Sequence, residues 1–221
     1  MDARIKKMGE DCLLTLYMAR HGQTEWNIEK RMQGWANSNL TPLGLANAKA
    51  LGEKLKSIPF QAAYVSTSGR AVDSARAILG DRTIPFIEDD IFREISLGSW
   101  EGKTYDEIKQ QDPGMLEAYF QASERYIPSG GESFQVFETR VKRAFEQIRA
   151  KHREGNVLLV SHSVFILMLL NILKERPLHE LWNSSYVHDT ALAVIAIPEQ
   201  GSAVIIKEGD GEHRIKENVY W

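Results

Sequence analysis

The most constraining feature of this 221-residue chain is a run of four apolar residues, Val157-Leu158-Leu159-Val160, which ends at Ser161-His162. A strand that is apolar at every position is typical of the centre of a parallel sheet, where helices cover both faces. The run therefore predicts an α/β fold. It also places a histidine at the point where a central strand ends.

Strands and helices alternate along the rest of the chain. The predicted strands cover residues 13–18, 61–66, 84–88 and 157–160. The predicted helices cover residues 41 to about 57, 70–80, 133 to about 155, and a segment that begins at 164. This order predicts a three-layer open, mostly parallel sheet with helices on both faces. Two further strands, 190–197 and 203–206, are joined by a turn and predict an edge hairpin.

A segment of different character lies between the third strand and the long helix. It contains the glycine- and tryptophan-rich stretch 97–102 and two short predicted helices, 104–111 and 115–122, separated by Pro113-Gly114. We expect this insertion, at about residues 98–132, to cover a site as a helical lid. The remaining chain from residue 13 to residue 221 forms one predicted domain, after a flexible lead-in of residues 1–12.

Composition excludes several classes of protein. The net charge is −3 and basic residues are not clustered, so nucleic acid is not an expected partner. The longest apolar run, 164–170, is too short to cross a membrane, and the polar N-terminus does not resemble a signal peptide. The single cysteine, Cys12, excludes an intrachain disulfide and fits a reducing compartment. We expect a cytoplasmic protein without a membrane partner.

Five polar residues each follow a predicted strand: Arg20, His21, Arg70, Glu94 and His162. Ligands of open α/β sheets bind outside the carboxyl ends of the strands, so these side chains are expected to meet at one edge. Two guanidinium groups beside two imidazoles repel one another unless an anion lies between them. A phosphoryl group fits this requirement, because arginines can bind its oxygens in bidentate fashion.

The motifs in combination resemble the histidine phosphatase superfamily. They comprise Arg20-His21-Gly22 with Thr24, Trp26 and Asn27; Ser66 to Arg70; the stretch from Arg93 to Gly102; Gly131-Glu132-Ser133; and Ser161-His162. The resemblance runs from about residue 14 to about residue 197. It is strongest to the phosphoglycerate-mutase-like branch, among broad-specificity bacterial phosphatases.

The resemblance implies a phosphomonoesterase of the histidine acid phosphatase type that needs no metal or cofactor. His21 would be the phosphohistidine nucleophile and Glu94 the general acid, while His162 would polarise the phosphoryl group. The implied phosphate-binding residues are Arg20, Arg70, Asn27, Gln33 and Ser163. The substrate would be a small phosphorylated metabolite. Ser163 stands where many family members have glycine, and Gln23 stands where many have glutamate.

Several alternatives stay open from the sequence. Glu101 and Asp90 compete with Glu94 for the role of acid. A cofactor-dependent phosphoglycerate mutase is disfavoured by the short insertion 103–125, which lacks an adjacent arginine pair. A cobalamin-precursor (alpha-ribazole) phosphatase and a non-catalytic phospho-ligand module are further alternatives. The other four histidines, at 152, 179, 188 and 213, lack the spacing of a zinc site.

The aromatic residues near the insertion are expected to be packing residues in the main: Trp35, Trp100, Tyr119, Phe120 and Tyr126. Any of them that lines the lid would favour apolar or aromatic leaving groups. Pairing of the carboxyl-terminal hairpin between two copies would give a homodimer, which the sequence permits without requiring.

Overall fold

The computed structural model describes residues 12–183 and 187–215, which form a six-stranded sheet with the order β3-β2-β4-β1-β5-β6. The strands are β1 (Cys12–Arg20), β2 (Phe60–Val65), β3 (Phe86–Glu88), β4 (Gly155–Ser161), β5 (Leu192–Pro198) and β6 (Val204–Asp210). The first four strands of this order are parallel, whereas β5 is antiparallel to β1 and β6 to β5. The predicted mostly parallel sheet is therefore confirmed.

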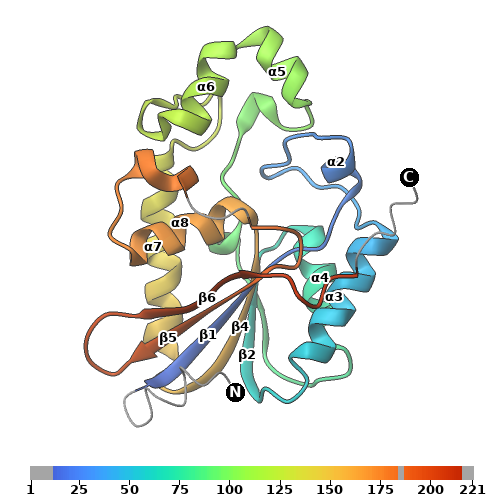
Figure 1. Cartoon of the computed structure of the whole chain (residues 1–221), viewed down its shortest axis with the longest axis vertical. Helices are drawn as coiled ribbons and strands as arrows, with labels where there is room; N and C mark the ends of the chain where they lie inside the picture. Colours follow the sequence, from blue (N-terminus) through green and yellow to red (C-terminus); the bar gives the residue numbers. More distant parts are fainter. Residues whose placement is uncertain (1–11, 184–186, 216–221) are drawn as a thin grey trace.

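Helices cover both faces of the sheet (Figure 1). On one face α3 (Pro42–Lys54) packs with α4 (Gly69–Leu79), and on the other α7 (Phe134–Lys151) packs with α8 (Ser163–Leu173). Each face has its own apolar cluster, and alternate residues of β1 contribute to the two: Leu16 and Met18 to one, Tyr17 and Ala19 to the other. The strands carry apolar side chains on both faces of the sheet, so helices pack against each face and three layers result.

The central position of β4 matches the apolar run that predicted it. Val157 to Val160 are at most 1% exposed, and β4 is bonded to β1 on one side and to β2 on the other. The hairpin of β5 and β6 also forms, with β6 as the outer strand of one edge. Whether two copies pair through this hairpin stays a prediction.

Element ends differ from the predictions by a few residues, for identifiable reasons. Strand β3 begins at Phe86 rather than at 84, because Pro85 has no N–H to donate to a ladder. Helix α7 begins as predicted, with Ser133 accepting a hydrogen bond from Val136 N, and ends at Lys151 because β4 already begins at Gly155. Of the predicted lead-in 1–12, residues 1–11 lie outside the described residues. Cys12 already belongs to β1.

The insertion stands beyond the carboxyl ends of the parallel strands, at the top of Figure 1. It contains α5 (Tyr105–Gln111), α6 (Pro113–Gln121) and the 3-10 turns Gly98–Trp100 and Ser123–Arg125. Another 3-10 turn, Leu178–Asn183, packs against α6 and α8. No helix in the described residues is both long and apolar enough to cross a membrane.

Candidate active site

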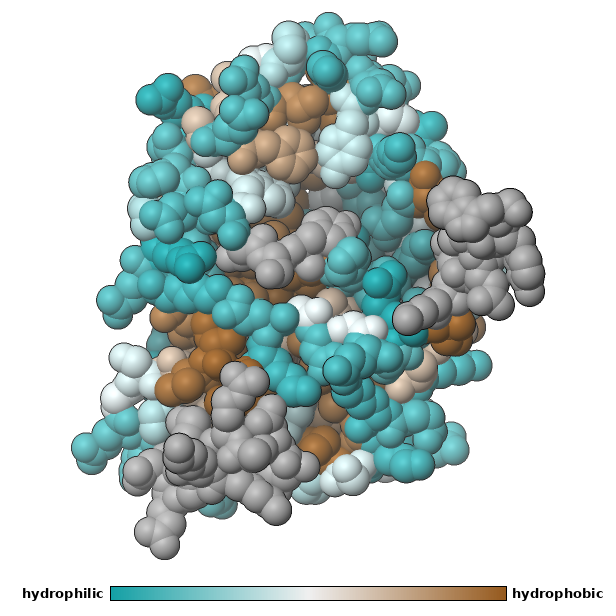
Figure 2. Space-filling view, viewed as in Figure 1, coloured by the Kyte–Doolittle hydropathy of each residue, from teal (hydrophilic) through white to brown (hydrophobic). Residues whose placement is uncertain are grey.

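A cavity of about 480 Å³ lies at the edge of the sheet where the parallel strands have their carboxyl ends, between these ends and the insertion. Its lining includes the ends of β1 and α8, helix α2 (Glu25–Ile28) and the insertion helices. Figure 2 shows hydrophobic residues at the surface between the hydrophilic residues on the outside of the insertion. The volume falls within the range of small-molecule sites. Of the predicted site residues, the cavity is lined by Arg20, His21, Asn27, Gln33, Arg70, Glu94 and Ser163.

His21 follows directly after β1 and is 3% exposed. Its Nδ1 lies 2.7 Å from the carbonyl oxygen of Gly22. A carbonyl only accepts, so Nδ1 carries the proton and Nε2 keeps its lone pair. Burial lowers the pKa of His21 well below its usual range, and the charges of Arg70 and Arg20 lower it further. The ring is therefore neutral, with the tautomer that a nucleophilic Nε2 requires.

The backbone around His21 is held from three directions. His21 N donates to Ser161 O at 3.0 Å, and His21 O accepts from Thr190 N at 3.2 Å. Gly22 N donates to Ser74 Oγ at 2.8 Å. A Cβ atom at Gly22 would lie 2.5 Å from Gly44 O, so a side chain at this position would push the two segments apart. Glycine is needed here because of this close approach.

Arg70 lies in the first turn of α4 and is 1% exposed. Its guanidinium donates to Gly34 O at 2.8 Å and to Ala36 O at 2.6 Å, so the 34–36 loop fixes its direction. Its Nε is buried and has no hydrogen-bond partner among the described residues. Burial lowers the pKa of Arg70 to about 10, which leaves it charged at neutral pH. A buried cation with an unused donor on a cavity wall is suited to an anion.

Arg20 ends β1 and points toward the same region, with Nη1 donating to Val187 O at 2.8 Å. It is 5% exposed, and its charge acts on His21, His162, Glu94 and Arg70. Two buried guanidinium groups thus face one cavity, as the sequence predicts. Their mutual repulsion would be relieved by a bound polyanion.

His162 lies behind Arg70 and does not line the cavity. Its ring centroid is 5.3 Å from that of His21. Arg70 Nη2 lies 3.2 Å from His162 Nδ1, and since a guanidinium only donates, Nδ1 is the acceptor. Nε2 then donates to Ser66 Oγ at 2.7 Å. Burial and the charge of Arg70 lower the pKa of His162 well below its usual range. Both ring nitrogens are therefore engaged within the protein.

Glu94 follows the 3-10 turn Asp90–Phe92 and is 7% exposed. Its Oε2 accepts from Val164 N and its Oε1 from Phe165 N, both at 3.0 Å, at the N-terminus of α8. Burial raises the pKa of Glu94, while the amides of Val164 and Ile95 and the charges of Arg70 and Arg20 oppose the rise. A carboxyl whose pKa is raised beside a cavity is suited to donate a proton.

Glu101 and Asp90, the two alternatives to Glu94 as the acid, have other contacts. Glu101 accepts from the backbone amides of Trp35, Ala36 and Leu97 at 2.9 to 3.0 Å, so it supports the loop that holds Arg70. Asp90 bonds to Thr67 and lies 3.8 Å from Arg93. Neither carboxylate lines the cavity, whereas Glu94 does.

The three remaining predicted residues line the cavity and are tied to their neighbours. Asn27 Oδ1 accepts from Thr24 N, and Gln33 Nε2 donates to Thr24 Oγ1 at 2.8 Å. Ser163 Oγ donates to Glu94 Oε2 at 3.5 Å. Ser163 thus contacts the predicted acid, and its role toward phosphate stays a prediction.

The insertion supplies part of the apolar lining of the cavity. Of the five aromatic residues named from the sequence, Tyr119 and Phe120 line it, whereas Trp35, Trp100 and Tyr126 do not. Sequence reasoning missed Tyr105 and Trp182, which also line it. Trp182 follows the apolar helix α8 within a 3-10 turn, and its ring centroid lies 5.0 Å from that of Phe120. In the sequence, the signal for Trp182 was a single aromatic side chain shortly after a helix predicted to be buried.

The model of the histidine phosphatase superfamily (branch 1) matches residues 16–207, which is most of the chain. The chain belongs to the histidine phosphatase superfamily. The resemblance stated from the motifs is therefore confirmed. In the described residues, no three or more His, Cys, Asp or Glu side chains are grouped as they would be to hold a metal ion.

Several of the proteins to which the chain is similar are named as phosphatases. YhfR of Bacillus stearothermophilus has a solved structure with a TM-score of 0.88 and 41% identity, covering 91% of this chain and 100% of that one. The adenosylcobalamin/alpha-ribazole phosphatase of Escherichia coli is 30% identical over 77% of this chain and 84% of its own. The metal-independent phosphoserine phosphatase of Arabidopsis thaliana is 34% identical over 77% of this chain and 73% of its own.

Proposed function

We propose that this histidine phosphatase is a metal-independent hydrolase of small phosphomonoesters that acts through a phosphohistidine at His21. One observation carries the proposal: a buried, neutral His21 presents its unprotonated Nε2 in a cavity that Arg20 and Arg70 also line. The phosphatase names of similar proteins support the reaction class, and the name of the Arabidopsis thaliana protein supports independence of metal.

The first half of the reaction transfers the phosphoryl group to the enzyme. Nε2 of His21 attacks phosphorus and forms an N–P bond while the ester P–O bond breaks. The leaving oxygen takes the proton of Glu94, whose raised pKa keeps that proton available. Arg20 and Arg70 bind the phosphoryl oxygens and supply the positive charge that a metal ion supplies in other phosphoryl-transfer enzymes.

The second half returns the enzyme to its starting state. Glu94, now a carboxylate, accepts a proton from a water molecule whose oxygen attacks phosphorus. The N–P bond breaks, phosphate leaves, and His21 is neutral again. His162, which is bonded to Arg70 and Ser66, holds Arg70 in place during both halves.

The cavity lining indicates which leaving groups are accepted. Tyr105, Tyr119, Phe120 and Trp182 form an aromatic wall beside the polar sheet edge. We expect esters with apolar or aromatic leaving groups to bind better than short polar ones, because the wall gains contact with them. Lys30 lines the same cavity, so an additional anionic group is compatible with it.

The test is phosphate release from a panel of phosphomonoesters in the presence of EDTA. The panel includes p-nitrophenyl phosphate, phenyl phosphate, phosphoserine, alpha-ribazole phosphate and 3-phosphoglycerate. Wild type should release phosphate, and His21→Ala should release none above background. His152→Ala is the matched control, because this histidine bonds to Tyr64 away from the cavity. Rapid quenching in alkali should trap an acid-labile phosphoenzyme in wild type and His152→Ala but not in His21→Ala.

Other outcomes identify the alternatives. Loss of activity in EDTA would contradict the metal-independent mechanism. Conversion of 3-phosphoglycerate to 2-phosphoglycerate on addition of 2,3-bisphosphoglycerate, without hydrolysis, would identify a mutase. Binding of phosphate esters without turnover would identify a non-catalytic module.

A further inference from the structure

We propose that Arg140 on α7, held by Glu132, is a positioning residue that aims Glu94 at the leaving group. This inference rests on the proposed role of Glu94 as the general acid. Arg140 does not line the cavity, so it acts on the reaction without touching the substrate. It binds the main-chain oxygen of Glu94, and its charge also contributes to the lowered pKa of His162. It was not among the residues that the sequence indicated for the site.

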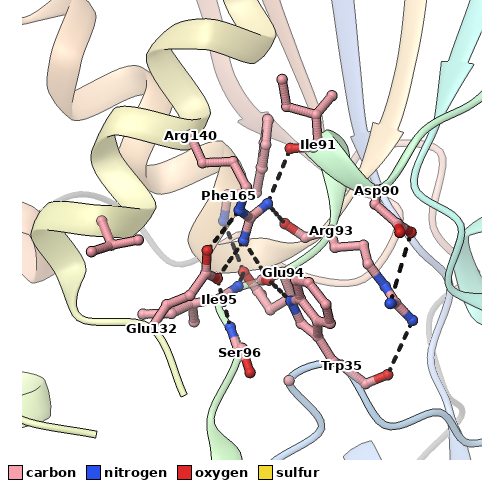
Figure 3. A network of polar contacts seen from close by, with 12 residues as sticks. Trp35, Asp90, Ile91, Arg93, Glu94, Ile95, Ser96, Glu132, Arg140 and Phe165 are labelled. Atoms are coloured by element: carbon pink, nitrogen blue, oxygen red, sulfur yellow. Dashed lines mark hydrogen bonds and ion pairs between the residues drawn. The ribbon is translucent and has the colours of Figure 1, made fainter. Parts of the chain in front are cut away.

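Arg140 uses all five of its N–H groups on partners around Glu94 (Figure 3). Nη1 donates to Ile91 O at 3.0 Å and to Arg93 O at 2.7 Å. Nη2 donates to Glu94 O at 2.8 Å. The other two N–H groups bind Glu132, with Nε to Oε1 at 2.8 Å and Nη2 to Oε2 at 2.6 Å. The planar guanidinium has no spare hydrogen, so its orientation is fixed.

Glu132 completes the arrangement from the end of the insertion. Its Oε2 also accepts from Ser96 N at 2.9 Å, on the other side of Glu94. The side chains of Glu132 and Arg140 are both only 15% exposed, so water competes little for their hydrogen bonds. One ion pair thus contacts the main chain at residues 91, 93, 94 and 96.

This support matters because the segment around Glu94 has no regular structure of its own. The 3-10 turn Asp90–Phe92 ends before Glu94, and the next turn begins at Gly98. The carboxyl end of the Glu94 side chain is bound to the N-terminus of α8, while its main-chain oxygen is bound by Arg140 and by Trp35 Nε1. Proton transfer to a leaving oxygen depends on placement within about 1 Å, and a looser main chain would lose that placement.

The experiment compares Arg140→Lys and Arg140→Met with wild type on phenyl phosphate and p-nitrophenyl phosphate. These substrates are alike in size and aromatic character, but p-nitrophenolate leaves with little need of a proton. The measured quantity is kcat/KM, which covers the steps up to departure of the alcohol. We expect Arg140→Lys to lower kcat/KM for phenyl phosphate about tenfold more than for p-nitrophenyl phosphate. Lysine keeps the charge but cannot replace the five-donor fork.

Two reference variants separate this inference from the proposed function. Glu94→Gln should show the same substrate dependence more strongly. Equal losses on both substrates in Glu94→Gln would mean that Glu94 is not the acid, and the proposed function itself would be wrong on this point. If Glu94→Gln lowers kcat/KM more for phenyl phosphate but Arg140→Lys lowers kcat/KM equally for both substrates, only the role of Arg140 is overturned.

Controls exclude a general loss of folding. Arg149→Met changes a half-exposed arginine of the same helix, which is paired with Glu146 and lies over the Phe145 ring, and should leave both rates within about twofold of wild type. In the Glu94→Gln background, Arg140→Lys should add no further difference between the two substrates. If Arg140→Met does not fold, Glu132→Gln keeps the arginine and loosens it, and the same selective loss is expected. An equal fall in kcat/KM for both substrates in Glu132→Gln and Arg140→Lys would contradict the proposal.

Discussion

The two sides of the cavity are built in different ways. At the sheet edge, His21, Arg70 and Glu94 are each fixed by hydrogen bonds to main-chain atoms at 2.6 to 3.1 Å. On the lid side, the rings of Tyr119, Phe120 and Trp182 pack against one another with centroids 4.9 to 5.2 Å apart, and Trp182 Nε1 also donates to Tyr119 O at 2.6 Å. Hydrogen bonds fix direction, whereas ring packing fixes contact area. The sheet edge should therefore determine rate, and the lid should determine which substrate binds.

The largest effect is expected at Arg70. Arg70→Met removes a buried cation from the cavity wall, and kcat/KM should fall about 10³-fold for every substrate. Arg70→Lys should recover little of the lost kcat/KM. An ammonium cannot make the hydrogen bonds that the planar guanidinium makes with Gly34, Ala36 and His162. Steady-state kinetics measures both variants.

The matched control for Arg70 is Arg82→Met. Arg82 also donates to a main-chain oxygen, Gly52 O at 3.0 Å, and lies over the Phe60 ring, but it does not line the cavity. A loss of less than tenfold in Arg70→Met, or an equal loss in Arg82→Met, would break the contrast between the two sides.

A smaller effect is expected at Gly22. In Gly22→Ala the new Cβ would lie 2.5 Å from Gly44 O. The shift that relieves this contact displaces the carbonyl of residue 22, which accepts the hydrogen bond of His21 Nδ1. We expect kcat/KM to fall about 10²-fold, since displacement of a nucleophile by about 1 Å has an effect of that order. Gly114→Ala is the control, because a Cβ there has no heavy atom within 4 Å. Normal activity in Gly22→Ala would show that the sheet edge tolerates movement.

The lid side should respond in binding instead. Phe120→Ala removes a ring that contacts Tyr105, Tyr119 and Trp182, and KM for aromatic esters should rise about tenfold while kcat changes little. Inhibition by inorganic phosphate, which has no leaving group, should stay unchanged. Ile127→Ala, at a residue 75% exposed on the same insertion, is the control. A fall in kcat alone would mean that the lid also acts in the chemical step.

The smallest effect concerns pH and stability. Burial and nearby arginines lower the pKa of His21 and of His162, so below pH 6.5 the unfolded chain binds protons that the folded protein does not. The free energy of unfolding should therefore fall as pH drops, by up to about 1.4 kcal/mol per pH unit for each histidine. The raised pKa of Glu94 acts in the opposite direction at lower pH, because the folded protein then binds its proton first.

Urea unfolding between pH 7.5 and pH 5.5 measures this dependence. The His162→Asn variant should have a shallower slope than wild type, because it removes a fully buried histidine, whereas His179→Asn replaces an exposed one and should match wild type. An unchanged slope in His162→Asn would mean that the sheet edge gains no proton-linked stability from this histidine.

Much of the site could be predicted because parallel strands bring their ends together. Arg20 and Ser161 are paired in the register of β1 and β4, so the histidines that follow them are neighbours although 141 residues apart in sequence (162 − 21). The strand pattern alone predicted that the two histidines are neighbours. It also carried the position of Arg70 at the start of α4.

Side-chain direction could not be predicted in the same way. Nothing in the pattern distinguishes His162, which lies behind Arg70, from His21, which lines the cavity. Glu94 and Glu101 both lie in irregular chain, where no periodicity assigns a face. Arg140 did carry a signal, because it shares the apolar face of α7 with Phe137 and Val141, and a cation on such a face requires a partner.

The contact between Glu94 and α8 joins the proposed acid to a helix N-terminus. His162, at the N-cap of α8, makes no capping hydrogen bond with its side chain, and the amides of Val164 and Phe165 bind the Glu94 carboxyl instead. A negative charge at a helix N-terminus is stabilised by the helix dipole, and a neutral carboxylic acid is stabilised less. In the proposed mechanism, the first turn of α8 is therefore tied more tightly when Glu94 gives up its proton and more loosely when it regains it. Amide exchange at Val164 and Phe165 would then report the protonation state of the acid during the catalytic cycle.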